Sequence, residues 1–136
     1  VVQRMATVQE HTLTCACSFG QRAAIEALKS PKDSIRPFLE ICNDGRRIIV
    51  DGLNKLPNIS CPSPKGTFYA FAKILNRELT SNNLSNFLLE KAGVMTVPGS
   101  AFGHGGEGYI RFSYALPKER IIEGLNRIRN VIATLK

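Results

Sequence analysis

The stretch of sequence that decides the fold is Val94–Ala115, VMTVPGSAFGHGGEGYIRFSYA. Its two ends, Val94–Val97 and Tyr109–Ala115, are rich in β-branched and aromatic residues and predict short strands. The residues between them begin with Pro98-Gly99 and continue with closely spaced glycines, which is typical of a loop. We therefore expect a strand, a glycine-rich loop and a second strand, in this order.

The second of these strands carries an arginine, Arg111, among apolar residues. Side chains of a strand alternate between its two faces, so Arg111 is expected on the face opposite Ile110 and Phe112. Such an arginine costs free energy unless an anion pairs with it, and its planar guanidinium binds a carboxylate through two parallel hydrogen bonds. The pattern leaves three interpretations open: a ligand carboxylate, an internal salt bridge, or the exposed face of an edge strand.

The loop also contains Gly103-His-Gly-Gly-Glu-Gly108, which matches the dinucleotide-binding pattern G-x-G-x-x-G. That pattern binds a pyrophosphate only where a strand precedes it and a helix follows, because the N-terminus of the helix contacts the phosphates. Here a predicted strand follows instead. We interpret the match as accidental and the segment as a turn.

The rest of the sequence predicts helices and two more short strands. One helix is expected to end near residue 28, and a long one covers 31–57, in which Gly45 is a candidate for a kink. Residues 59–61 and 67–72 are typical of strands, and further helices begin at Thr80-Ser81 and at Pro117. The expected apolar stripes are Ile35, Phe38, Leu39, Cys42, Ile49 and Leu53 in the long helix, and Ile121, Leu125, Ile128, Ile132 and Leu135 in the last one.

This order of elements predicts an α+β fold, a small mixed sheet covered by helices. Residues 1–30 have no strand to join that sheet and are expected to belong to a neighbouring domain. Residues 31–57 form a long interdomain helix and 58–136 a small domain. Because the chain begins with Val1 and not with methionine, we also expect it to start partway through a longer protein.

The composition argues against several classes of function. The net charge is +7, but the basic residues alternate with acidic ones, which favours solvated helix faces over nucleic-acid binding. No run approaches the roughly 18 apolar residues that a membrane span needs. The four cysteines lack the paired spacing of a zinc site, so we expect free cytosolic thiols and no metal.

Three blocks of the sequence occur in the order and spacing of one enzyme family: Gln21–Leu28, Pro64–Phe71, and Val94–Gly103 with Gly106–Ala115. Together they resemble the class I and II aminotransferases, the fold-type I pyridoxal-phosphate enzymes of the aspartate and aromatic aminotransferase group. The resemblance spans nearly the whole chain and does not single out one substrate. It implies pyridoxal 5'-phosphate as cofactor, an amino acid and a 2-oxo acid as substrates, and a cytoplasmic homodimer.

The resemblance also implies roles for individual residues. Arg111 matches the arginine of the last strand that binds the α-carboxylate of the amino acid, and Phe68 loosely matches an aromatic position near the substrate. Residues 1–30 correspond to the end of the large cofactor-binding domain, and 58–136 to the C-terminal small domain. The loop that approaches the active site when the small domain closes is matched by Pro98, Gly99, Ser100 and Phe102.

No lysine of this chain matches the family's Schiff-base lysine, and the other cofactor-binding residues of the family also lie upstream. We therefore expect neither a catalytic nor a cofactor-binding residue here, and no activity from the 136 residues alone. Two alternatives stay open. One is a pyridoxal-phosphate-dependent lyase or synthase that uses the same arginine, and the other is a non-catalytic, stand-alone α+β binding module.

Overall fold

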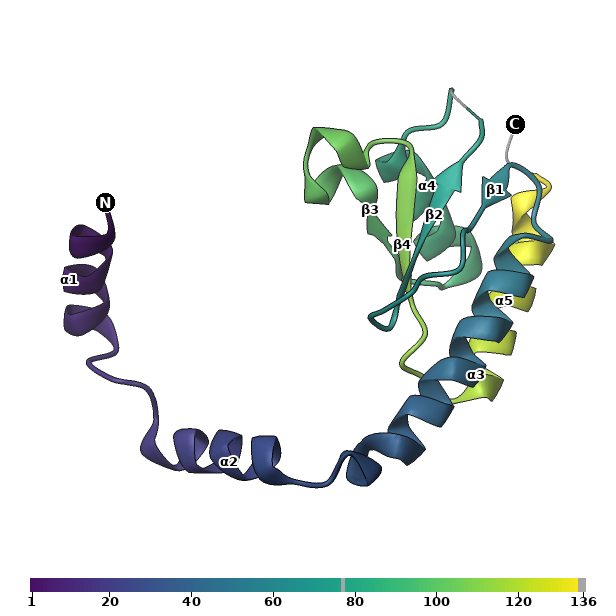
Figure 1. Cartoon of the computed structure of the whole chain (residues 1–136). Helices are drawn as coiled ribbons and strands as arrows, with labels where there is room; N and C mark the ends of the chain where they lie inside the picture. Colours follow the sequence, from purple (N-terminus) through teal and green to yellow (C-terminus); the bar gives the residue numbers. More distant parts are fainter. Residues whose placement is uncertain (77, 135–136) are drawn as a thin grey trace. The chain divides into compact units, whose positions relative to one another are not determined.

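The computed structural model describes residues 1–76 and 78–134, without the side chain of Lys32. The chain forms two compact units, Val1–Arg36 and Pro37–Lys136. The whole sheet belongs to the second unit (Figure 1). None of the described helices is long and apolar enough to cross a membrane.

The first unit consists of helix α1 (Val2–Thr12), helix α2 (Ser18–Lys29) and a 3₁₀ turn, η1 (Lys32–Ile35). Neither α1 nor α2 buries a residue. Their large apolar side chains are exposed to solvent; Phe19 is 81% exposed and Leu28 88%. These helices therefore carry apolar side chains without a core of their own.

The second unit contains a four-stranded sheet in the order β1-β2-β4-β3. Its strands are β1 (Ile59–Ser60), β2 (Tyr69–Ile74), β3 (Val97–Pro98) and β4 (Tyr109–Ser113). Strands β2 and β4 form the centre of the sheet, with Phe71 opposite Arg111. On its other side β4 pairs with β3, where Val97 lies opposite Arg111. The strand that carries Arg111 is therefore central.

The expected α+β class is confirmed, but the sheet differs from the expected mixed one. All three pairs of neighbouring strands in the described part of the chain are antiparallel. Strands β2 and β3 do run in the same direction, joined through helix α4 (Ser81–Phe87), as in a β-α-β unit. Because β4 inserts between them and runs opposite to both, no parallel pair forms.

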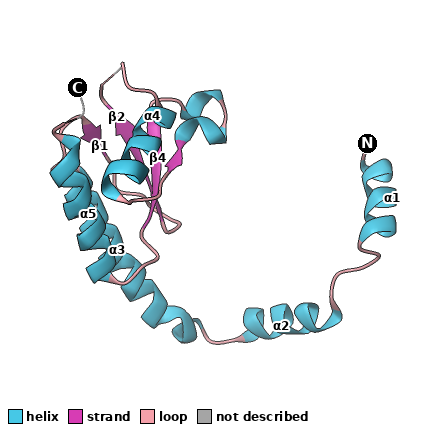
Figure 2. Cartoon of the chain, turned by 180° about the vertical axis from the view of Figure 1, so that it is seen from behind, coloured by secondary structure: helices cyan, strands magenta, loops and turns pink. Residues whose placement is uncertain are grey.

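Helices cover one face of this sheet. They are α3 (Arg36–Leu53), α4 with its π-helical continuation η2 (Leu88–Ala92), and α5 (Lys118–Ile132). Helices α3 and α5 lie side by side in both views of the chain (Figures 1 and 2). The buried apolar residues form one cluster that joins these helices to the sheet, and its members include Leu53, Leu84, Ile110, Phe112 and Ile128.

Helix α3 stays α-helical through Gly45, the residue that was the candidate for a kink. A Cβ atom on Gly45 would lie 2.7 Å from the backbone oxygen of Tyr114 and 3.2 Å from Cδ1 of Ile121. The glycine therefore permits a close approach between α3 and the end of β4. Sequence periodicity does not report such an approach, because the approaching residues lie elsewhere in the chain.

Only part of each predicted apolar stripe can be assigned to the core. In α3, Ile49 and Leu53 are buried, whereas Phe38 and Leu39 are exposed. Helix α5 begins after Pro117, as predicted. Leu135, the last member of the predicted stripe, lies outside the described part of the chain. The buried residues of α5 are Ile121, Leu125, Ile128 and Ile132.

Strand β3 is shorter than the predicted strand Val94–Val97, because the residues before it bond to a helix instead. The backbone N–H of Val94 donates to the carbonyl of Leu88 at 3.1 Å. The hydroxyl of Ser85 donates to the carbonyl of Thr96, also at 3.1 Å. These bonds connect the residues just before β3 to η2 and α4.

Candidate functional site

Arg111 lies on the face of the sheet opposite the core, as the alternation of its strand predicts. Its neighbours Ile110 and Phe112 are buried on the other face, while Arg111 is half-buried. The guanidinium carbon lies 4.1 Å from the ring centre of Tyr69 and 4.8 Å from that of Phe102. The π faces of these rings attract the cation and leave its N–H groups free to donate elsewhere.

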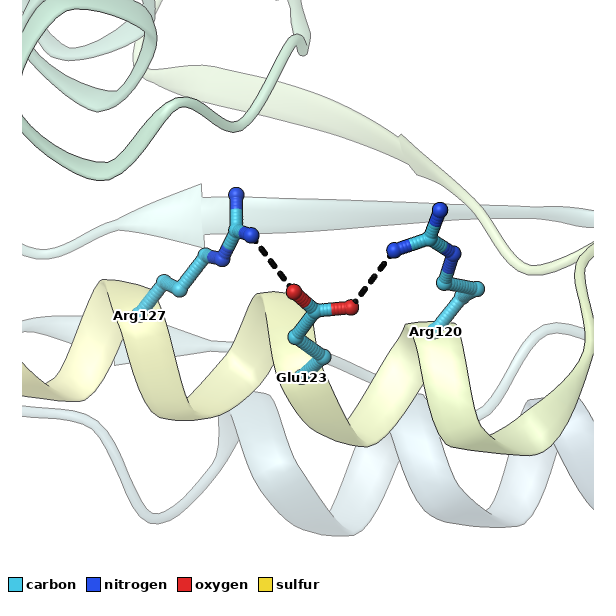
Figure 3. A network of polar contacts seen from close by, with 3 residues as sticks. All are labelled: Arg120, Glu123 and Arg127. Atoms are coloured by element: carbon cyan, nitrogen blue, oxygen red, sulfur yellow. Dashed lines mark hydrogen bonds and ion pairs between the residues drawn. The ribbon is translucent and has the colours of Figure 1, made fainter.

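No residue among 1–76 and 78–134 forms an ion pair with Arg111. The ion pairs of this part of the chain are local, as in the Arg120–Glu123–Arg127 network of α5 (Figure 3). There the hydrogen bond from Arg120, followed by the charge of Arg127, lowers the pKa of Glu123. Within the described residues, neither an internal salt bridge nor an edge strand accounts for Arg111.

Two aromatic rings contact this arginine, those of Tyr69 and Phe102, and the rings of Phe71 and Tyr109 continue the cluster. We call these four side chains the aromatic face. Phe71 stacks on Tyr109 with ring centres 5.0 Å apart and planes inclined by 2°. It also meets the Phe102 ring edge-on at 6.0 Å. The rings form a surface of low polarity beside the guanidinium. A hydrogen bond that the guanidinium donates to an anion there is weakened less by water.

Sequence reasoning did not single out three members of the aromatic face, namely Tyr69, Phe71 and Tyr109. For Tyr69 and Phe71 the signal is the Tyr-Ala-Phe-Ala run at 69–72, in which small residues face the core and rings face away. The run can be related to Arg111 only through the pairing of β2 with β4, because the register of these strands places Phe71 opposite Arg111.

Phe68, the other aromatic residue implied by the resemblance, lies just before β2. Its carbonyl accepts a hydrogen bond from the N–H of Tyr114 at 2.9 Å. Its ring is 38% exposed and lies 4.4 Å, centre to centre, from the Tyr69 ring. Tyr69, one residue further on, is the ring in contact with Arg111, and a substrate-binding role for Phe68 stays a prediction.

The Pro98–Phe102 segment turns back sharply against the end of the same loop. It continues from β3 into a 3₁₀ turn, η3 (Gly99–Phe102), which packs on a second one, η4 (His104–Gly106). A Cβ atom on Gly99 would overlap the carbonyl of Gly106, and one on Gly106 would overlap that of Gly99. The G-x-G-x-x-G match is thus part of a compact turn followed by a strand, as predicted.

A group of polar side chains fastens this loop to α4. The Glu107 carboxylate accepts hydrogen bonds from the backbone N–H of Ser81 at 2.8 Å and from its hydroxyl at 2.9 Å. The hydroxyl oxygens of Ser81 and Ser100 lie 3.2 Å apart, and Asn82 donates to Ser100 at the same distance. The pKa of Glu107 is lowered, first by the Ser81 N–H and then by the Ser81 hydroxyl.

The Arg111 guanidinium offers donors that suit a carboxylate. A Schiff-base lysine needs a shielded position, and the lysine side chains in the described part of this chain are exposed: Lys29, Lys55, Lys65, Lys73, Lys91 and Lys118. Among residues 1–76 and 78–134, no three His, Cys, Asp or Glu side chains are grouped so that they could hold a metal.

The comparisons with known proteins agree on one family. The model of the family "Aminotransferase class I and II" matches residues 1–128. Over 134 residues, the chain is 40% identical to an aspartate aminotransferase of Pyrococcus horikoshii, covering 97% of this chain and 34% of that protein. It is 34% identical over 138 residues to aromatic-amino-acid aminotransferase 2 of Thermococcus litoralis, covering 100% of this chain and 35% of the relative.

Comparison with solved structures also indicates the aminotransferase family. The crystal structure of an aromatic aminotransferase from Pyrococcus horikoshii superposes with a TM-score of 0.86 and 36% sequence identity, covering 98% of this chain and 36% of that one. The chain thus spans about a third of the length of the curated relatives it matches, 34% and 35% for the two named above.

Proposed function

The chain belongs to the class I and II aminotransferases, and we propose that it forms the substrate-binding, C-terminal part of an amino-acid aminotransferase. The observation that carries the proposal is the Arg111 guanidinium, held between the rings of Tyr69 and Phe102. It has no carboxylate partner within 1–76 and 78–134. The α-carboxylate of an amino acid supplies that partner.

The geometry suits a carboxylate in particular. A guanidinium donates two parallel N–H groups to the two oxygens of a carboxylate, which fixes the plane of the bound group as well as its position. Tyr69 and Phe102 flank the guanidinium and restrict its rotation. Holding the substrate in one orientation is itself a large part of catalysis in reactions between bound groups.

Pyridoxal 5'-phosphate, the cofactor of this family, supplies the electron sink for amino-group transfer. Within the proposal, the substrates are an amino acid of the aspartate or aromatic type and a 2-oxo acid, between which the bound cofactor would carry the amino group. Arg111 holds the carboxylate of each substrate in turn. The chain contributes orientation, and the Schiff-base lysine comes from outside these residues, so the 136 residues alone are inactive.

The same proposal assigns parts of the chain to the whole enzyme. Residues 1–30 belong to the large cofactor-binding domain and 58–136 to the small domain. Residues 31–57 connect the two, and the interdomain helix within them is α3, which is shorter than predicted and runs from Arg36 to Leu53. The exposed apolar side chains of α1 and α2 support a covering partner, either the large domain or the second subunit of a homodimer. The four free cysteines favour a reducing, cytoplasmic location.

The Pro98–Phe102 segment takes part in closure over the substrate. It carries Phe102, whose ring already lies against the Arg111 guanidinium. A movement of the small domain that brings Arg111 to the substrate therefore brings this ring as well. In the closed state the ring keeps water away from the carboxylate and its arginine.

The test is Arg111→Lys in an enzyme that contains this chain as its C-terminal third. Lysine keeps the charge but loses the two parallel donors, so KM for the amino acid should rise by roughly 10- to 100-fold. Arg129→Lys is the matched control, because Arg129 is exposed on α5 and bonds only to Asn126 among the described residues. Steady-state kinetics with several amino acids and with their 2-oxo acids measure both variants, and an unchanged kcat/KM for Arg111→Lys would refute the proposed role.

A further inference from the structure

The Glu107 carboxylate has no part in the proposed binding of the substrate, although it lies only four residues before Arg111 in the sequence. Its two oxygens accept two hydrogen bonds from one residue, the N–H and the hydroxyl of Ser81, at 2.8 and 2.9 Å. Ser81 is buried at the start of α4. Glu107 thus ties the end of the glycine-rich loop to a helix that is distant in sequence.

Ser81 connects Glu107 to the beginning of the same loop. A hydroxyl has a single proton, and the charged carboxylate is the stronger acceptor for it. The lone pairs of the Ser81 oxygen then remain to accept from Ser100, whose backbone N–H lies 3.4 Å away and whose hydroxyl oxygen lies 3.2 Å away. The charge on Glu107 therefore sets the direction of the hydrogen bonds that hold Ser100.

Ser100 in turn lies in the same 3₁₀ turn as Phe102, the ring on one side of the Arg111 guanidinium. This turn makes polar contacts through Ser100 and aromatic contacts through Phe102. A continuous series of contacts therefore runs from Glu107 to Arg111 through Ser81, Ser100 and the η3 turn.

We propose that Glu107 is a positioning residue: its carboxylate, acting through Ser81 and Ser100, holds the η3 turn so that the Phe102 ring keeps the Arg111 guanidinium oriented for a carboxylate. The consequence for substrate binding rests on the proposed function of Arg111. The positioning itself is a property of the chain and can be measured without any substrate.

Glutamine in place of Glu107 would fill the same space with the wrong donors and acceptors. Ser81 presents two donors, whereas an amide offers only one acceptor oxygen. The amide NH₂ would therefore have to donate to the Ser81 hydroxyl oxygen, and the Ser81 proton would turn toward Ser100. Glu107→Gln thus disturbs the connection to the η3 turn with a minimal change in volume.

The first experiment compares Glu107→Gln with Glu119→Gln in the enzyme that contains this chain. Glu119 lies in the first turn of α5 and is also exposed, so its replacement removes the same charge from another helix start. Weakening the hydrogen bonds between Ser81 and Glu107, which act on Arg111 through the η3 turn and Phe102, should raise KM for the amino acid about fivefold and leave kcat within about twofold, with no change in the control. An unchanged KM, or a fall in kcat that Glu119→Gln shares, overturns the proposal.

A double variant tests the route through Ser100. If Glu107 acts through Ser81 and Ser100, then Ser100→Ala and Glu107→Gln remove parts of one connection. Their effects on KM should be less than additive when combined, because residues of one network do not contribute independently. Strictly additive effects overturn this route.

The second experiment uses the 136-residue chain and nuclear magnetic resonance, without substrate. In the wild-type chain the hydrogen bond to the Glu107 carboxylate should shift the Ser81 amide proton to low field, and Glu107→Gln should reduce this shift. The same variant should weaken the nuclear Overhauser contacts between the Phe102 ring and the Arg111 side chain. Glu119→Gln should keep both signals. Retained Phe102–Arg111 contacts overturn the positioning role. If these contacts weaken while Arg111→Lys leaves the kinetics unchanged, the proposed function fails and the positioning role stands.

Discussion

At the scale of single residues, Arg111 shows how a cation is kept on the open face of a central strand. Contact with an aromatic ring contributes about 0.5–1 kcal/mol at a partly exposed site. Two rings, from Tyr69 and Phe102, provide such contacts. They do not replace the hydrogen bonds that the guanidinium would make to water or to an anion, so its donors remain available to a ligand.

Glu107 leads to a prediction about pH. Its pKa lies below the ordinary 4.5, and the largest cause is the hydrogen bond that the carboxylate accepts from the Ser81 N–H. A carboxylate whose pKa is lower in the folded than in the unfolded state adds to the free energy of unfolding. This contribution is fully present above the unfolded-state pKa and is lost as the pH falls through the folded-state pKa. The Tm difference between the wild-type chain and Glu107→Gln should therefore be constant near neutral pH and narrow as the pH drops below 4.5.

Thermal unfolding followed by circular dichroism, from neutral pH down to about pH 3, measures this difference. Glu123, whose pKa is also lowered, is present in both proteins, so its contribution cancels. A Tm difference that stayed the same throughout this range would show that the charge of Glu107 plays no part in stability.

At the scale of elements, the Gly99–Phe102 turn and the residues that follow it act as one piece. Gly99 and Gly106 approach each other so closely that neither has room for a Cβ atom. The polar contacts of Ser100 and Glu107 then hold this piece against α4. A short loop with so many fixed points can present an aromatic ring in one orientation.

Replacing Gly99 with alanine should therefore destabilise the second unit by about 1–3 kcal/mol, the usual cost of overpacking. The matched control is Gly105→Ala in the same loop, because a Cβ atom there meets nothing within 4 Å. Urea unfolding of both variants measures the change in the free energy of unfolding. Equal stability of the two variants would contradict the close approach of Gly99 to Gly106.

At the scale of the whole molecule, the two units differ in how they are stabilised. The buried apolar cluster lies entirely in residues from Ile49 onward, and α1 and α2 bury nothing. Isolated helices of 11 and 12 residues are marginal in water, because most helical stability in proteins comes from packing. The first unit therefore needs a covering surface that it does not itself contain.

For the 136-residue chain this predicts an uneven pattern of hydrogen exchange. Amides of α1 and α2 should exchange quickly, or become protected only as the chain self-associates, whereas those of β2, β4 and α5 should be protected by the core. Exchange measured by mass spectrometry at several protein concentrations separates these cases. Uniform protection across the chain in a monomer would contradict the prediction.

Much of the fold could be predicted because it depends on local patterns. Apolar spacing indicated α3 and α5, and alternation in β4 indicated that Arg111 faces away from Ile110 and Phe112. The shortening of β3 could not be predicted, since the bonds that cause it come from Leu88 and Ser85 in another element. The antiparallel sheet likewise follows from the insertion of β4 between β2 and β3, which no single segment records.

The sequence by itself indicated the α+β class and the family, and it singled out Arg111 as the candidate to bind a carboxylate, because periodicity and motifs are properties of neighbouring residues. Only the tertiary structure decided what surrounds that arginine. Tyr69 and Phe71 reach Arg111 through the register of two strands, and Ser81 meets Glu107 across 26 positions of sequence. Contacts between distant segments depend on how the whole chain packs, and local patterns do not specify them.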